Sequence, residues 1–197
     1  MNLQGRSIYL RHCNEQDIPL LFQWRNSEEF RSKCSIRRKE ISLDDFKKEL
    51  ERDFHRDRHI QMMIVRKSDG KPIGTIYSYD YKKIDQYLFV TIFLPKEFQT
   101  NGYGVEAVVL FLQYLFKGFP LFKIYMEVYE YNTQSLSCIR GARFAEEGRF
   151  IKHRLFNGIR YDLLRFAVYR DKNLQQIERF LRRLKRGAWT LTKSKNQ

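Results

Sequence analysis

The sequence lacks any apolar run that could cross a bilayer. Its longest apolar run, Ala107 to Phe116, is interrupted by Gln113 and is far shorter than the roughly 20 residues that a spanning helix needs. The first residues carry no apolar signal core, so we expect a cytoplasmic protein without a membrane span.

Paired cysteines are also missing. The three cysteines are odd in number, scattered, and without Cys-x-x-Cys spacing, which favours reduced thiols over a disulfide framework. His55 and His59 lie four residues apart, but no metal-binding motif accompanies them. We therefore expect a solvated helix end there and no metal site.

Negative charge is scarce. The 37 Lys and Arg residues outnumber the 23 Asp and Glu residues, which gives a formal charge of +14. Such a balance attracts nucleic acid, membrane surfaces, phosphorylated ligands or acidic proteins, and it argues against polycations such as spermidine as substrates. The charge alone does not choose among the anions.

What the sequence does contain is enough for a packed globule. Of its 197 residues, 43% are hydrophobic and 15% aromatic, which excludes general disorder and fits one domain. We place this domain at residues 1–170 and a basic helix and tail at residues 171–197. The tail is not interleaved with aromatic residues in the way that a single-strand stacking platform would be. Nucleic acid is therefore not the favoured partner.

The apolar spacing predicts an alternation of helices and strands. Period-2 and period-3.6 patterns mark the elements, and Asn157-Gly158 predicts a tight hairpin turn. Residues 28–39 are left open as a loop or a frayed helix. We expect strands at 7–11, 60–66, 72–81, 86–94, 123–129, 144–156 and 159–169, and helices at 14–26, 43–54, 105–116, 132–140 and from 171 onward.

One glycine loop stands between a predicted strand and a predicted helix. Gly102 and Gly104 let backbone N–H groups approach a ligand without a Cβ in the way. The amino end of the next helix then favours an anion. No Lys follows Gly104, as a Walker loop would require, and Ala107 stands where a dinucleotide fingerprint has its third glycine. The loop is thus a phosphate cradle of another kind.

The order of elements around this loop resembles the GNAT superfamily of N-acetyltransferases. Gln99, Gly102 and Gly104 are similar to the acetyl-CoA signature Gln/Arg-x-x-Gly-x-Gly/Ala. Asn132-x-x-Ser135, followed by Phe144 and Glu147-Gly148, is similar to the RimJ/RimL-like branch, as is Trp24-Arg25-Asn26. The resemblance covers about residues 7–170. It implies an α/β fold with a mixed, mostly antiparallel sheet, splayed at one parallel strand pair and with helices on both faces.

The resemblance also implies a site for acetyl-CoA as cosubstrate. Loop backbone amides would hold the pyrophosphate, the splayed strand would pair with the pantetheine arm, and an asparagine would contact the arm. An amine would then attack the thioester directly. The residues assigned to the cofactor are Ile92, Phe93, Leu94, Gln99, Asn101, Gly102, Tyr103, Gly104, Val105 and Asn132.

Two positions depart from the family pattern. The strand before the loop lacks the catalytic glutamate that many members carry, so Asp85 or an ordered water is our candidate base. Ile139 occupies the place of the usual tyrosine acid, and we assign Ser135 to the sulfur.

The acceptor stays open among an amino sugar, another anionic small molecule and a protein N-terminus, and the protein is expected to be a monomer or homodimer. The alternative is a catalytically silent GNAT-like fold that binds nucleic acid or an acidic protein.

Overall fold

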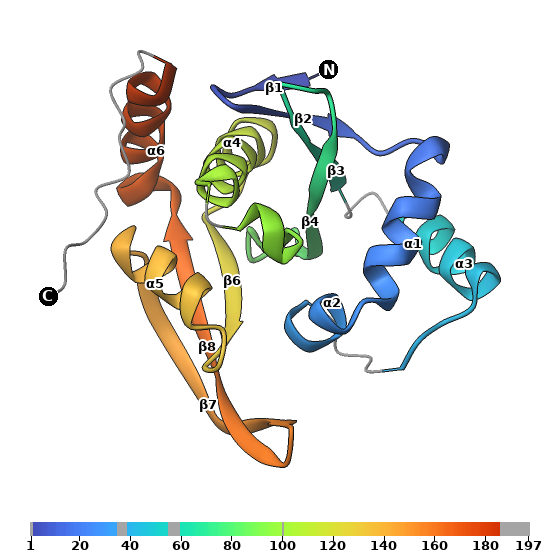
Figure 1. Ribbon diagram of the computed structural model, residues 1–197. Coiled ribbons are helices and arrows are strands. Elements are labelled where there is room, and N and C mark those ends of the chain that lie inside the picture. The colour runs from blue at the N-terminus through green and yellow to red at the C-terminus, as the bar shows by residue number, and fades with distance from the viewer. Residues whose placement is uncertain (1, 35–38, 55–59, 100, 186–197) are drawn as a thin grey trace, which may run out of the picture.

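A computed structural model describes residues 2–34, 39–54, 60–99 and 101–185 of the chain. These residues form one mixed sheet with helices on both faces (Figure 1). His55 and His59, the cluster Arg37-Arg38, and the end of the predicted tail lie outside the described residues.

The described elements follow the predicted order. The strands are β1 (Asn2–Gln4), β2 (Ile8–His12), β3 (Ile60–Arg66), β4 (Pro72–Lys82), β5 (Tyr87–Phe93), β6 (Lys123–Tyr129), β7 (Ala145–Phe156) and β8 (Ile159–Tyr169). The α-helices are α1 (Ile18–Asn26), α2 (Glu28–Lys33), α3 (Leu43–Phe54), α4 (Tyr103–Gly118), α5 (Thr133–Gly141) and α6 (Arg170–Lys185). Short 3-10 helices occur at η1 (Glu15–Asp17) and η2 (Lys96–Phe98).

The sheet order is β1-β2-β3-β4-β5-β6-β8-β7, and β5 and β6 are its parallel pair. Every other neighbouring pair is antiparallel. This confirms the predicted fold class. The hairpin at Asn157-Gly158 is confirmed as well, because both residues have positive φ (48° and 77°), which a type I′ turn requires.

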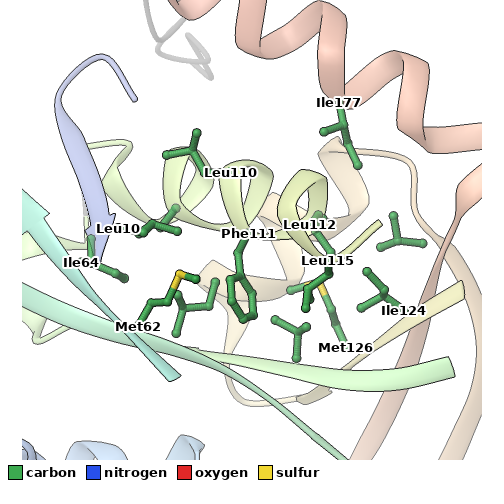
Figure 2. Packing of buried hydrophobic residues seen from close by; sticks show 14 of the residues in the cluster. Leu10, Met62, Ile64, Leu110, Phe111, Leu112, Leu115, Ile124, Met126 and Ile177 are labelled. Atoms are coloured by element: carbon green, nitrogen blue, oxygen red, sulfur yellow. The ribbon is translucent and has the colours of Figure 1, made fainter. Parts of the chain in front are cut away.

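Alternating strand residues pack into two separate hydrophobic clusters, one on each face of the sheet. On β3, Met62 and Ile64 join the core beneath α4, whereas Met63 and Val65 join the cluster beneath α1, α2 and α3. Successive strand side chains point to opposite faces, so a continuous apolar run serves both layers. In Figure 2, Phe111 points from α4 toward the strands, and it is 0% exposed.

Helix α6 covers the side of α4 that faces away from the sheet (Figure 1). Its residues Ile177, Leu181 and Leu184 are buried in the same cluster as the α4 core. The described part of the segment predicted as a basic appendage therefore packs on the main core. Strand β1 is an addition to the predicted elements, and of the two alternatives left open for residues 28–39, Glu28–Lys33 is helical.

Candidate active site

The parallel strands β5 and β6 separate at a defined residue. Their pairing runs from Tyr87↔Lys123 to Phe89↔Tyr125 and ends there, although both strands continue for four more residues. Beyond this point β5 stays paired with β4, and β6 stays paired with β8. The sheet is thus open between the carboxyl ends of β5 and β6, where the backbone can pair with an inserted ligand.

Two helix amino ends converge on this opening. Helix α4 begins after Gly102, whose φ of 77° lies in the left-handed region, and α5 begins after Asn132. The Gln134 side chain donates to the Gln99 carbonyl at 3.0 Å, which joins the first turn of α5 to the glycine loop. Both helix dipoles favour a negative charge at this end of the sheet.

The predicted cofactor residues lie at this end of the sheet. Ile92 and Phe93 are the last two residues of β5, and Leu94 follows them. The loop from Gln99 to Val105 leads into α4. Phe93 packs against Trp24 and Phe30 with ring centroids 5.9 and 5.2 Å apart, so helices α1 and α2 fix the strand end. Asn132 Oδ1 accepts the Ser135 N–H at 3.4 Å, which places Ser135 in the first turn of α5.

Asp85 is not brought to these residues. It lies in the exposed turn before β5, at the amino end of that strand. Because β5 has seven residues at about 3.3 Å each, its two ends are roughly 20 Å apart. Asp85 is therefore not placed to accept a proton at the carboxyl end.

A different carboxylate, Glu127, lies beside the opening. It stands on β6 two residues past Tyr125, where pairing with β5 has ended. Arg165 Nε and Nη2 donate to Glu127 Oε1 at 2.9 and 2.6 Å, and no described residue bonds Oε2. Sequence reasoning examined only the strand before the glycine loop for an acid. A lone carboxylate in the strand after α4 was the signal available in the sequence.

The tyrosine Tyr79 of β4 lies close enough to Glu127 for the two groups to interact electrostatically. Burial, the largest cause, raises the pKa of Tyr79 to about 12, while a hydrogen bond with Thr91 opposes the rise and the charge of Glu127 adds to it. Burial likewise raises the pKa of Tyr77 well above its ordinary value. Both phenols stay protonated at neutral pH, so they can donate hydrogen bonds, as Tyr77 does to the Cys34 carbonyl, but cannot act as bases.

A family model decides what this arrangement is. The model described as an acetyltransferase (GNAT) domain matches residues 7–145, the segment that holds the splayed strands, the glycine loop and Asn132. The chain belongs to the GNAT acetyltransferase family. It is therefore an N-acetyltransferase that uses acetyl-CoA as cosubstrate.

Two known proteins similar to this acetyltransferase are described as N-acetyltransferases. A probable N-acetyltransferase, YjcK of Bacillus subtilis, is 28% identical over 164 residues, which cover 80% of this chain and 91% of that protein. The spermidine N(1)-acetyltransferase of Escherichia coli K12 is 23% identical over 124 residues, 61% of this chain and 67% of the enzyme.

Solved structures share the fold at lower identity. The spermidine N-acetyltransferase of Vibrio cholerae, solved with CoA and spermine, has a TM-score of 0.78 at 20% identity and covers 84% of this chain and 97% of its own. RimL, a ribosomal L7/L12 alpha-N-protein acetyltransferase solved with CoA, has a TM-score of 0.76 at 16% identity, with coverages of 88% and 100%. These likenesses establish the fold and leave the acceptor unassigned.

The thiols of this acetyltransferase are poorly suited to carrying the acetyl group. Burial raises the pKa of Cys34 and of Cys13 to about 12 and raises that of Cys138. A thiol nucleophile reacts as its thiolate, and these groups stay protonated at neutral pH. Their state agrees with direct attack by the amine.

Among the described residues, no helix is long and apolar enough to span a membrane.

Proposed function

We propose that this acetyltransferase moves an acetyl group from acetyl-CoA to a primary amine on an anionic small molecule, such as a phosphorylated amino sugar. The observation that carries the donor half is the three-residue pairing of β5 and β6, which leaves two strand ends open beside two helix amino ends. The loop amides from Gln99 to Val105 would hold the pyrophosphate, and Ile92 to Leu94 would pair with the pantetheine arm.

The carboxylates near the opening support an anionic acceptor. Glu127 Oε1 is bound by Arg165 at 2.6 Å, and Glu29 Oε1 lies 3.3 Å from Lys33. A polyamine site needs carboxylate oxygens that can face several ammonium groups, and one oxygen of each of these carboxylates already faces a cation. With the overall charge of +14, the surroundings of the opening favour an anion.

One positive side chain, Arg154, lies beside the end of β6. Arg154 of β7 is only 6% exposed, and its guanidinium carbon lies 4.9 Å from the centre of the Tyr129 ring. Tyr129 is the last residue of β6, so this guanidinium sits beside the strand end. A buried guanidinium favours a ligand that brings a carboxylate or phosphate.

The proposed step uses a neutral amine. Glu127 Oε2 accepts a proton from the acceptor ammonium through a water, after which the amine nitrogen bonds to the acetyl carbon. The carbon–sulfur bond then breaks, and the leaving CoA thiolate takes a proton at the sulfur, while the second proton lost by the bonded nitrogen replaces the one that the sulfur's donor gives. Ser135 is proposed as the hydroxyl donor to that sulfur, because it stands in the first turn of α5 beside the opening.

The test is CoA release measured with acetyl-CoA and a panel of amines. The panel contains a hexosamine 6-phosphate, the unphosphorylated hexosamine, spermidine, and a peptide with a free N-terminus. We expect the phosphorylated sugar to have a kcat/KM at least about tenfold above that of spermidine, which equals about 1.4 kcal/mol. A preference for spermidine or for the peptide would contradict the acceptor assignment. Absence of any thermal stabilisation by acetyl-CoA would contradict the donor site.

A further inference from the structure

The short helix α2 is tied to the glycine loop through one carboxylate. Glu29 Oε1 accepts the Gln99 side-chain amide at 2.6 Å, and Glu29 Oε2 accepts the Lys96 backbone N–H at 3.2 Å. The same Gln99 amide donates to the Leu94 carbonyl at 2.7 Å. One side chain of α2 thus contacts the segment between the end of β5 and the proposed pyrophosphate loop.

The other end of α2 is tied to the strands around the opening. Two carbonyl groups of α2 accept hydrogen bonds: Arg31 O from Arg154 Nη2 of β7 at 3.1 Å, and Ser32 O from the Tyr131 hydroxyl. The carbonyl of Cys34, the residue that caps α2, accepts the Tyr77 hydroxyl of β4 at 3.3 Å. The Cys34 thiol also donates to the Ile92 carbonyl at 3.5 Å. These contacts make α2 a wall of the acceptor side, beside the guanidinium of Arg154.

A helix of six residues depends on such contacts, because isolated helices shorter than about 12 residues are marginal in water. The position of α2 is therefore set by the contacts at its two ends. The contact at its amino end is a charge-assisted pair of hydrogen bonds, which are the strong kind. A change in the glycine loop is therefore transmitted to α2 through Glu29.

We propose that Glu29 is a positioning residue that couples acetyl-CoA binding to the acceptor side of the site. The inference rests on the proposed function, since it takes the loop as the pyrophosphate site. Cofactor phosphate fixes the loop amides, the loop fixes Gln99 and the Lys96 amide, and these hold Glu29 and the wall formed by α2. Because such coupling is reciprocal, an ordered α2 also strengthens cofactor binding.

Hydrogen exchange measured on the full chain, with CoA as the probe, tests this coupling without a known acceptor. We expect CoA to slow amide exchange in α2 about tenfold in the wild type, within the usual range of coupling between sites. In Glu29→Ala the slowing in α2 should fall below about twofold, while the slowing in the loop remains. Glu29→Gln keeps an oxygen acceptor and should restore part of the effect.

Glu28→Ala is the matched control. Glu28 also lies in the first turn of α2 and is exposed, so its loss removes the same charge near the helix amino end without touching the loop. It should keep the wild-type response. The coupling would be overturned if CoA slowed amide exchange in α2 equally in Glu29→Ala and in the wild type. It would also be overturned if CoA slowed exchange in the loop alone in the wild type. Both results would leave the proposed donor site standing. Failure of CoA to slow exchange in the loop or to stabilise the wild type would overturn the proposed function and the coupling together.

Discussion

Gly74 sets the position of the end of β5, and its replacement by alanine should weaken both the fold and cofactor binding. A Cβ at Gly74 would lie 2.4 Å from the Phe93 carbonyl oxygen and 2.8 Å from Leu94 Cδ2. Ordinary van der Waals contact begins at 3.4 Å, so strands β4 and β5 must separate by about 1 Å at this point. The nearest atom belongs to the backbone and cannot move aside alone. The strain therefore displaces the segment that we assign to the pantetheine arm.

The expected magnitude follows from this displacement. Overpacking of a well-packed site costs about 1–3 kcal/mol, which lowers Tm by roughly 2–12 °C for a chain of this size. If Ile92 to Leu94 pair with the cofactor arm, the Kd for acetyl-CoA should rise about tenfold, equal to about 1.4 kcal/mol. Differential scanning calorimetry gives Tm, and isothermal titration gives Kd.

Gly118→Ala is the matched control for this prediction. It makes the same chemical change at the end of α4, where a Cβ would meet no atom within 4 Å. We expect a change near zero or a stabilisation of about 0.4–1 kcal/mol, because alanine restricts the unfolded chain. A drop in Tm for Gly74→Ala with an unchanged Kd would refute the reasoning, because the end of β5 would then have moved without affecting the cofactor.

Two further predictions concern single carboxylates. Glu127→Gln should lower kcat about 100-fold at neutral pH with the KM for acetyl-CoA unchanged. Part of the loss should return at high pH, where the amine is already neutral; a pH-independent loss would argue against proton transfer. Asp17→Asn should cost about 2–3 kcal/mol at pH 7, because Arg11 bonds Asp17 through two nitrogens at 2.6 and 2.7 Å. Burial alone would raise the pKa of Asp17, but these bonds and the Asn14 amide lower it. The folded pKa is thus below the unfolded value near 3.9, so the contribution is present above pH 4 and is lost as pH falls through the folded pKa. Urea unfolding between pH 2 and 7 measures this, and a constant difference across that range would contradict it.

The backbone geometry of the proposed donor half was predictable because its signals are local. The apolar strand, Gly102, Gly104 and Asn132 all act on the backbone within a few residues of themselves, through φ, helix starts and caps. The parallel pairing of β5 and β6 followed from the helix between them. The same local logic gave the hairpin turn at Asn157-Gly158.

The contacts on the proposed acceptor side were not predictable because they join distant residues. Glu29 meets Gln99 across 70 positions, and Glu127 meets Arg165 across 38. No period or short motif records such a pairing. The state of Glu28–Lys33 stayed open for the same reason, since this short helix is fixed by contacts from other elements.

The difference that we propose from relatives that act on spermidine is the sign of the acceptor's charge. A polyamine needs several carboxylate oxygens to face its ammonium groups, but Arg165 already holds Glu127 Oε1 through two nitrogens, which leaves Oε2 for the reacting amine alone. Releasing Oε1 would leave the guanidinium of a half-buried arginine without its partner, at a cost that a weak surface contact with an ammonium does not offset. Family membership therefore fixes the donor, whereas the anionic acceptor is our proposal, which the paired state of Glu127 supports.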